Sequence, residues 1–181
     1  MDRRFLIYTC SCRPRGNAWQ LARCAARALP ADHVEWIDLT TADVPPFADL
    51  RPAAPPLSPP LDALWAQTAR ATDLVFATPI YWYALPAPAK LWLDHWSGFL
   101  DHPDLNFAQT MRGKSLWLMT TRADPDPGVA RPIEEALRQT ARWLGMDWGG
   151  ALHAIANGVD EVQTSTAWDQ AKAFLTQPPL A

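Results

Sequence analysis

Cysteine is scarce in this chain, with three residues among 181. An odd number of thiols cannot pair fully within one chain, so the count favours a reduced protein over a disulfide-stapled one. Apolar runs are broken by charge, proline or glycine well before the roughly 18 residues that a membrane helix needs. The first residues lack the long apolar region and small-residue cleavage site of a signal peptide. We therefore expect a cytoplasmic protein with no membrane partner.

A basic excess is also missing, since the net charge is -3 and the pI is near 5.7. This balance disfavours a nucleic-acid or anionic-membrane surface, either of which requires clustered positive charge. Six of the sixteen basic residues nevertheless fall within the first 27 positions, against one acid: Arg3, Arg4, Arg13, Arg15, Arg23 and Arg27. This cluster is either a solvated helix face or a surface that meets an anion.

Short apolar runs alternate with helical patterns along the whole chain. The runs predict five strands, near residues 5–8, 34–39, 73–78, 115–120 and 148–156. Patterns with three- and four-residue spacing predict helices that follow each strand. This β-α alternation predicts one doubly wound α/β domain over residues 1–181, with a parallel sheet and helices on both faces. Residues 40–60, rich in proline, are interpreted as an irregular excursion from this domain.

Three loops are candidates for a binding site, because ligands bind outside the carboxyl ends of strands in such sheets. They span residues 9–17, 78–84 and 120–128. The first leads into a helix start, which is an anion site, and it carries Arg13 and Arg15. It has neither a Walker lysine nor the spaced glycines of a dinucleotide loop, so a monophosphate fits better. The alternative is an ordinary strand-to-helix turn.

The second loop places three aromatic side chains in a row, Tyr81, Trp82 and Tyr83, after the clearest strand. They suit a planar ligand, although rings in this position also cap cores or form subunit interfaces.

Two of these segments resemble a known family. Residues 11–17 resemble an S-x-R-x-x-G-N phosphate loop, and residues 77–82, followed by Lys90 and Asp94, resemble an A-T-P-[IV]-Y-W loop and K-x-x-x-D helix. Both motifs are those of the NADPH-dependent FMN reductases, and the resemblance covers roughly residues 4–122. It implies a flavodoxin-like sheet of order 2-1-3-4-5. The sequence departs at Cys10 and Ala18, where the family usually has glycine and threonine.

The resemblance also implies a function and a set of site residues. We expect FMN to carry a hydride from NADPH or NADH to a quinone, a flavin or another small acceptor, with no catalytic side chain and no metal. The implied FMN contacts are Ser11, Arg13, Arg15, Gly16, Asn17 and Ala18 at the phosphate, and Pro79, Ile80, Tyr81, Trp82, Tyr83, Thr120, Thr121 and Arg122 at the ring. The alternatives are a flavodoxin-like electron carrier and a flavin-free binding module.

Assembly is the last expectation. Trp92 and Trp96 lie four residues apart on the helix after the aromatic loop, and an exposed stripe of such rings marks a contact surface. We therefore expect a homodimer, or a homotetramer, with the partner and the proline-rich excursion lining the open flavin face.

Cys10 and Cys12 do not have C-x-x-C spacing and are interpreted as packing residues.

Overall fold

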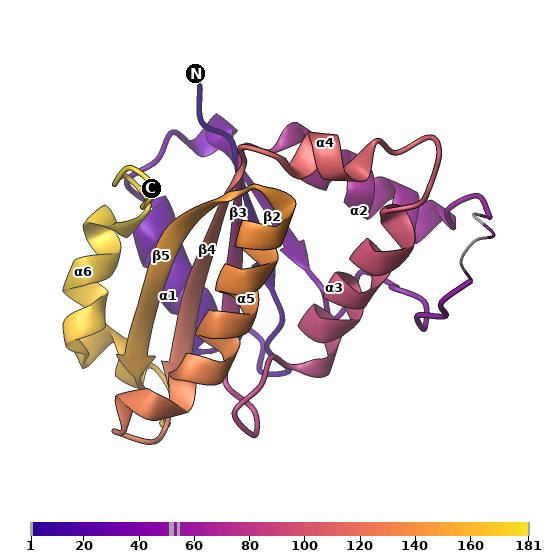
Figure 1. Ribbon diagram of the computed structural model, residues 1–181. Helices are drawn as coiled ribbons and strands as arrows, with labels where there is room; N and C mark the ends of the chain where they lie inside the picture. The colour runs from indigo at the N-terminus through magenta and orange to yellow at the C-terminus, as the bar shows by residue number, and fades with distance from the viewer. Residues whose placement is uncertain (1, 51–52, 54, 181) are drawn as a thin grey trace.

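A computed structural model describes residues 2–50, 53 and 55–180 as a three-layer α/β domain (Figure 1). Five parallel strands form one sheet in the order β2-β1-β3-β4-β5, which confirms the expected topology. The strands are β1 (Phe5–Thr9), β2 (Val34–Asp38), β3 (Asp73–Pro79), β4 (Ser115–Arg122) and β5 (Asp147–Ile155).

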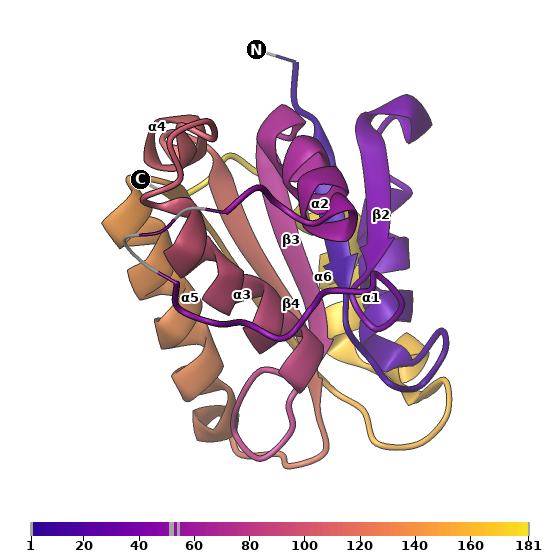
Figure 2. The ribbon, with the colours of Figure 1, turned by 90° about the vertical axis from the view of Figure 1, so that its right-hand side faces the viewer.

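Helices cover both faces of the sheet, as Figure 2 shows with α2, α3 and α5 in front and α1 and α6 behind. Their bounds are α1 (Asn17–Ala26), α2 (Pro59–Arg70), α3 (Ala87–Phe99), α4 (Phe107–Met111), α5 (Arg131–Leu144) and α6 (Thr166–Phe174). Three 3-10 turns complete the order, η1 (Ala31–His33), η2 (Pro127–Ala130) and η3 (Glu161–Thr164). The short α4 and the 3-10 turns were not predicted. No helix in the described ranges is long and apolar enough to span a membrane.

Two apolar cores lie on opposite faces of the sheet. One joins α2, α3, α4 and α5 to the strands, and the other joins α1 and α6. Trp92 and Trp96 belong to the first core and are 0% and 4% exposed, so the expectation that they form an exposed stripe is wrong. They face the sheet because Ala89, Trp92, Trp96 and Phe99 form the buried side of α3.

The last strand is interrupted where it passes Trp117. The pairing register of β4 and β5 shifts between Leu116 and Trp117. A Cβ atom on Gly149 would lie 2.1 Å from Cδ2 of the buried Trp117 indole, so only glycine leaves room for the ring. Gly149 of β5 therefore accommodates a large side chain of the neighbouring strand.

A buried lysine lies at the amino ends of the central strands. Lys114 is 8% exposed, and its ammonium donates hydrogen bonds to the carbonyls of Ala69, at 2.9 Å, and Ala71. Burial lowers the pKa of Lys114, while the nearby Asp73 carboxylate opposes that shift. The Asp73 carboxylate itself accepts from Arg3 and from the Trp117 indole.

The proline-rich excursion crosses the outer side of α3 (Figure 2). The ring of His95 lies 5.4 Å from that of Phe47, and its Nε2 is 2.8 Å from the Pro45 carbonyl oxygen. Residues 51, 52 and 54 of the excursion lie outside the described residues. The described part covers a helix, and it does not line the hollow at the carboxyl edge of the sheet that is described next. The expectation that it lines the site is wrong for those residues.

Candidate flavin site

A hollow of about 140 Å³ opens at the carboxyl edge of the sheet, where the loops after β1, β3, β4 and β5 meet. It is lined by Ser11, Arg13, Gly16, Asn17, Ala18, Pro79, Ile80, Tyr81, Thr121, Arg122, Ala123, Ala156 and Asn157. Ten of these were predicted from the sequence. The structure therefore brings all three predicted loops to one place.

The first loop folds tightly before α1 begins. The Arg13 backbone N–H donates to Ser11 Oγ at 3.2 Å, and the Gly16 N–H donates to the Arg13 carbonyl at 3.1 Å. Gly16 caps the helix, and a Cβ atom there would lie 3.2 Å from both Ser11 Oγ and the Arg13 carbonyl oxygen. The first turn of α1, which leaves backbone N–H groups without helical acceptors, faces the hollow through Asn17 and Ala18.

The loop after β5 was missed by the sequence analysis. The Arg13 guanidinium donates to the Asn157 carbonyl at 3.3 Å, and the Asn17 amide donates to the Gly158 carbonyl at 2.8 Å. Glu161 fixes this loop by accepting the Asn157 and Gly158 N–H groups at 2.7 and 2.6 Å, which lowers the pKa of Glu161. The available signal was an Asn-Gly turn directly after a predicted parallel strand, whose carboxyl end must share the same edge.

Arg15 lies outside the hollow. Its φ of 51° turns the chain, and its guanidinium carbon lies 5.9 Å from the centroid of the Trp19 ring, in the range of a cation-π contact. It lines a separate hollow on the outside of α1. The positive charge at the flavin site therefore comes from Arg13 and Arg122, and no carboxylate is among the lining residues.

The aromatic loop is a tight turn that projects into solvent. Tyr81 and Ala84 exchange backbone hydrogen bonds of 3.1 Å, and the two residues between them have φ values of 52° and 63°. This is the pattern of a type I′ turn, which large side chains adopt at a cost. Trp82 is 90% exposed and Tyr83 57%, and neither lines the hollow, whereas Pro79, Ile80 and Tyr81 do.

The end of β4 supplies the third wall. Thr121 and Arg122 line the hollow, and the Arg122 guanidinium donates to the Asp124 carbonyl. Thr120 is fully buried beside them, and its Oγ1 has no hydrogen-bond partner within the described part of the chain.

The two departures from the family motif lie on different sides of this loop. Cys10 is buried behind it, its Sγ lies 3.9 Å from the Ala77 carbonyl oxygen, and burial raises its pKa to about 12. Ala18 faces the hollow. Cys12 is exposed, so the interpretation of both motif cysteines as packing residues is wrong for Cys12.

The residues present fit the phosphate of FMN better than they enclose the whole molecule. A helix start, Arg13 and Ser11 suit a phosphate dianion, and the carboxylate-free lining adds no repulsion. Sites for small ligands usually enclose about 300–1,000 Å³. At about 140 Å³ the hollow is smaller, so it would enclose only part of a planar ring that Tyr81 and Thr121 flank.

The chain belongs to the flavodoxin-like fold family, whose model matches residues 3–176. It is 28% identical over 149 residues to YwqN of Bacillus subtilis, whose name describes an NAD(P)H-dependent FMN-containing oxidoreductase, with 80% of this chain and 81% of the relative covered.

Two solved structures share the fold. The Trp repressor binding protein of Bacillus subtilis superposes with a TM-score of 0.79 at 21% identity, covering 97% of this chain and 99% of its own. An FMN-dependent NADH-azoreductase of Bacillus anthracis, solved in complex with FMN, gives 0.69 at 12% identity, covering 97% and 98%.

Proposed function

We propose that the protein is an FMN-dependent NAD(P)H oxidoreductase that acts on a small acceptor such as a quinone or a flavin. The observation that carries the proposal is a carboxylate-free hollow in which a helix start and Arg13 adjoin an aromatic turn. The name of the Bacillus subtilis relative, an NAD(P)H-dependent FMN-containing oxidoreductase, supports the same activity. Bound FMN would supply the two-electron chemistry between donor and acceptor.

The side chains of this chain would then bind and orient. Arg13, Ser11 and the first turn of α1 would hold the phosphate, while Ile80, Tyr81 and Thr121 would flank the ring. Asn17 already bonds to the last loop, so its side chain holds the two loops together beside the phosphate. The three unpaired thiols suit a reducing compartment, and we place the protein in the cytoplasm.

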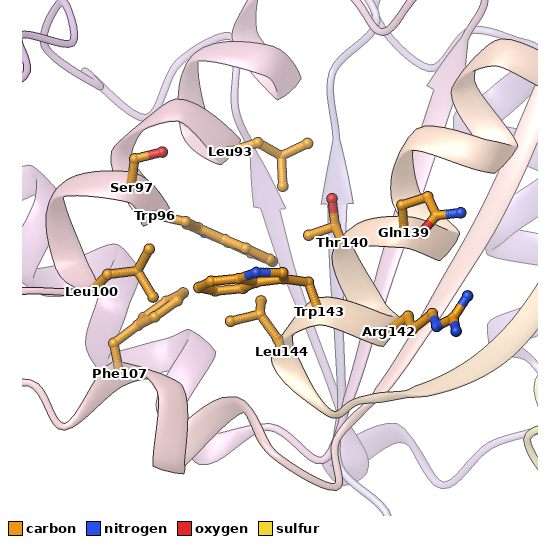
Figure 3. A pocket seen from close by; sticks show the side chains of 10 residues that line it. All are labelled: Leu93, Trp96, Ser97, Leu100, Phe107, Gln139, Thr140, Arg142, Trp143 and Leu144. Atoms are coloured by element: carbon orange, nitrogen blue, oxygen red, sulfur yellow. The ribbon is translucent and has the colours of Figure 1, made fainter.

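A groove between two outer helices suits a homodimer. An apolar groove of about 630 Å³ lies between α3 and α5, with Leu93 and Leu100 on the α3 side and Trp143 of α5 facing them (Figure 3). Trp143 is 68% exposed, an unusual position for a large ring unless a partner covers it. A second copy on this groove would bury both Trp143 rings by two-fold symmetry. The groove lies along the later turns of α3 and α5, whereas the aromatic turn precedes the first turn of α3, so this pairing leaves the hollow open.

Sedimentation at micromolar concentration tests the dimer. We expect a dimer for the wild type, a monomer for Trp143→Glu, and a dimer for the control Leu180→Glu, which changes another exposed apolar residue. A monomeric wild type, or dissociation of both variants alike, would contradict this interface.

Anaerobic titration tests the activity. The purified protein is titrated with FMN, separated from free flavin and mixed with NADPH or NADH, and the absorbance near the oxidised flavin maximum is followed. Rapid bleaching that reverses on addition of a quinone supports the proposal. Stoichiometric FMN binding without reduction by either donor would instead indicate an electron carrier, and absence of FMN binding would indicate a flavin-free module.

A further inference from the structure

A second hollow, of about 500 Å³, runs along the outside of α1 beside the loop after β5 and the start of α6. We call it the α1 groove. Figure 1 shows α1 and α6 on the same side of the sheet, at its left, and the two helices pack together. The groove shares Arg13, Gly16 and Asn17 with the flavin site, so the two hollows lie on either side of one loop. Its volume falls within the range of small-molecule sites.

Positive charge dominates the α1 groove. Arg15, Arg23 and Arg27 line it together with the shared Arg13, and Asp160 is the one acid among the lining residues. The Asp160 carboxylate accepts a hydrogen bond of 2.6 Å from the Gln20 amide. Within the described ranges, none of the four arginines forms an ion pair with a carboxylate. Guanidinium groups that line one hollow without a carboxylate partner are suited to the oxygens of a phosphorylated ligand.

Aromatic walls accompany this charge. Trp19 and Arg23 lie one turn apart on the same side of α1, and Arg27, four residues further, is the C-cap of this helix, so the three span about 12 Å. Trp168, at the start of α6, lines the other side. The centroid of the Trp19 ring lies 6.2 Å from that of Trp36 and 5.9 Å from the guanidinium carbon of Arg15. A merely solvated basic face would need neither the hollow nor the two indoles.

From this combination we infer that the α1 groove binds a nucleoside diphosphate, with its base against an indole and its phosphates on Arg23 and Arg27. Guanidinium forks match phosphate oxygens, and indole faces stack on a planar base. The same chemical group occurs in free ADP, in NAD(P)H, and in the tail of FAD, which would cross the shared loop from the flavin site. The inference does not require that the proposed oxidoreductase activity is correct.

Calorimetric titration of the flavin-free protein with ADP tests the site. We expect saturable binding that Arg23→Ala/Arg27→Ala weakens at least tenfold, since two charge-assisted contacts are lost. The control Arg4→Ala/Arg131→Ala removes two exposed arginines outside the groove and should change the affinity less than twofold. FMN affinity of the groove variant should stay within twofold of the wild type, which separates this site from the flavin site.

Two further titrations identify the source of the nucleotide. If FMN-loaded protein still binds ADP, the groove takes a separate nucleotide. If FMN excludes ADP and FAD binds more tightly than FMN in the wild type but not in the groove variant, the groove takes the tail of FAD.

Three results would overturn the inference. The first is no ADP binding at millimolar concentration, and the second is an equal loss of ADP affinity in the groove variant and the control variant. The third is exclusion of ADP by FMN with no advantage for FAD, because ADP would then occupy the flavin phosphate loop.

Discussion

The aromatic turn should gain stability when its rings are removed. Trp82 and Tyr83 occupy consecutive left-handed positions, with φ of 52° and 63°, between the paired backbone groups of Tyr81 and Ala84. Two-residue turns of this kind favour Asn followed by Gly. The double substitution Trp82→Asn/Tyr83→Gly therefore keeps the turn and removes its strain.

The magnitude follows from the exposure and the backbone. A left-handed conformation costs an L-residue about 1–2 kcal/mol, and asparagine and glycine adopt it more readily. Trp82 is 90% exposed, so its removal sacrifices little apolar burial, while Tyr83 at 57% sacrifices somewhat more. Glycine also gives the unfolded chain more conformational entropy, which lowers the free energy of unfolding by about 0.5–1 kcal/mol. The net expectation is a gain of about 1 kcal/mol in the free energy of unfolding.

Urea unfolding of the flavin-free protein, followed by circular dichroism, measures this gain. Leu180→Asn is the control, because it removes another exposed apolar side chain, outside the proposed dimer groove and without a positive φ, and should not stabilise the protein. FMN affinity of the turn variant should fall if the turn supports the ring. A loss of stability of 1 kcal/mol or more in the turn variant would refute the argument that these residues carry strain for a functional reason.

Three other changes test the packing and the charges. Gly149→Ala should lower the free energy of unfolding by at least about 3 kcal/mol, because its Cβ would lie 2.1 Å from the Trp117 indole. The control Gly113→Ala, in open space at φ of 75°, should lower it by about 1 kcal/mol. Equal losses in the two variants would contradict the clash. In native protein a thiol reagent at pH 8 should modify Cys12 first, because Cys10 and Cys24 are buried and have raised pKa values. Bound FMN should slow the modification of Cys12, which lies in the predicted phosphate loop. Reaction of all three thiols at one rate would contradict this. Burial lowers the pKa of Lys114, so the unfolded chain binds more protons between that lowered pKa and 10.5, and wild-type stability should gain as pH rises through this window. Lys114→Met should lack that gain, and identical pH dependence of the two proteins would contradict it.

The sheet and most of the site could be predicted because they depend on local patterns. Buried strands such as β3 read as continuous apolar runs, and the topological rule then brings their following loops together. The orientation of α3 could not be predicted, since Leu93 and Leu100 are as apolar as Trp92 and Trp96, and only tertiary packing selects which side meets the sheet.

The position of Arg15 was hidden for a different reason. Its left-handed backbone directs a side chain from the middle of the phosphate motif to the far side of α1, and spacing alone does not reveal a single φ angle. The loop after β5 was missed because it carries no charged or aromatic residue before Asp160.

Affinity for FMN and for riboflavin, measured by fluorescence titration of the wild type, Arg13→Ala and Arg15→Ala, tests the central claim most directly. Arg13 lines the flavin site and Arg15 does not. A charge-assisted contact to phosphate contributes about 1.5–3 kcal/mol, so Arg13→Ala should weaken FMN binding by roughly 10- to 100-fold. Riboflavin, which has no phosphate, should change less than threefold, and Arg15→Ala should leave both affinities nearly unchanged. A wild type that binds no FMN, or an Arg13→Ala variant that weakens both flavins equally, would contradict a flavin phosphate site at the start of α1.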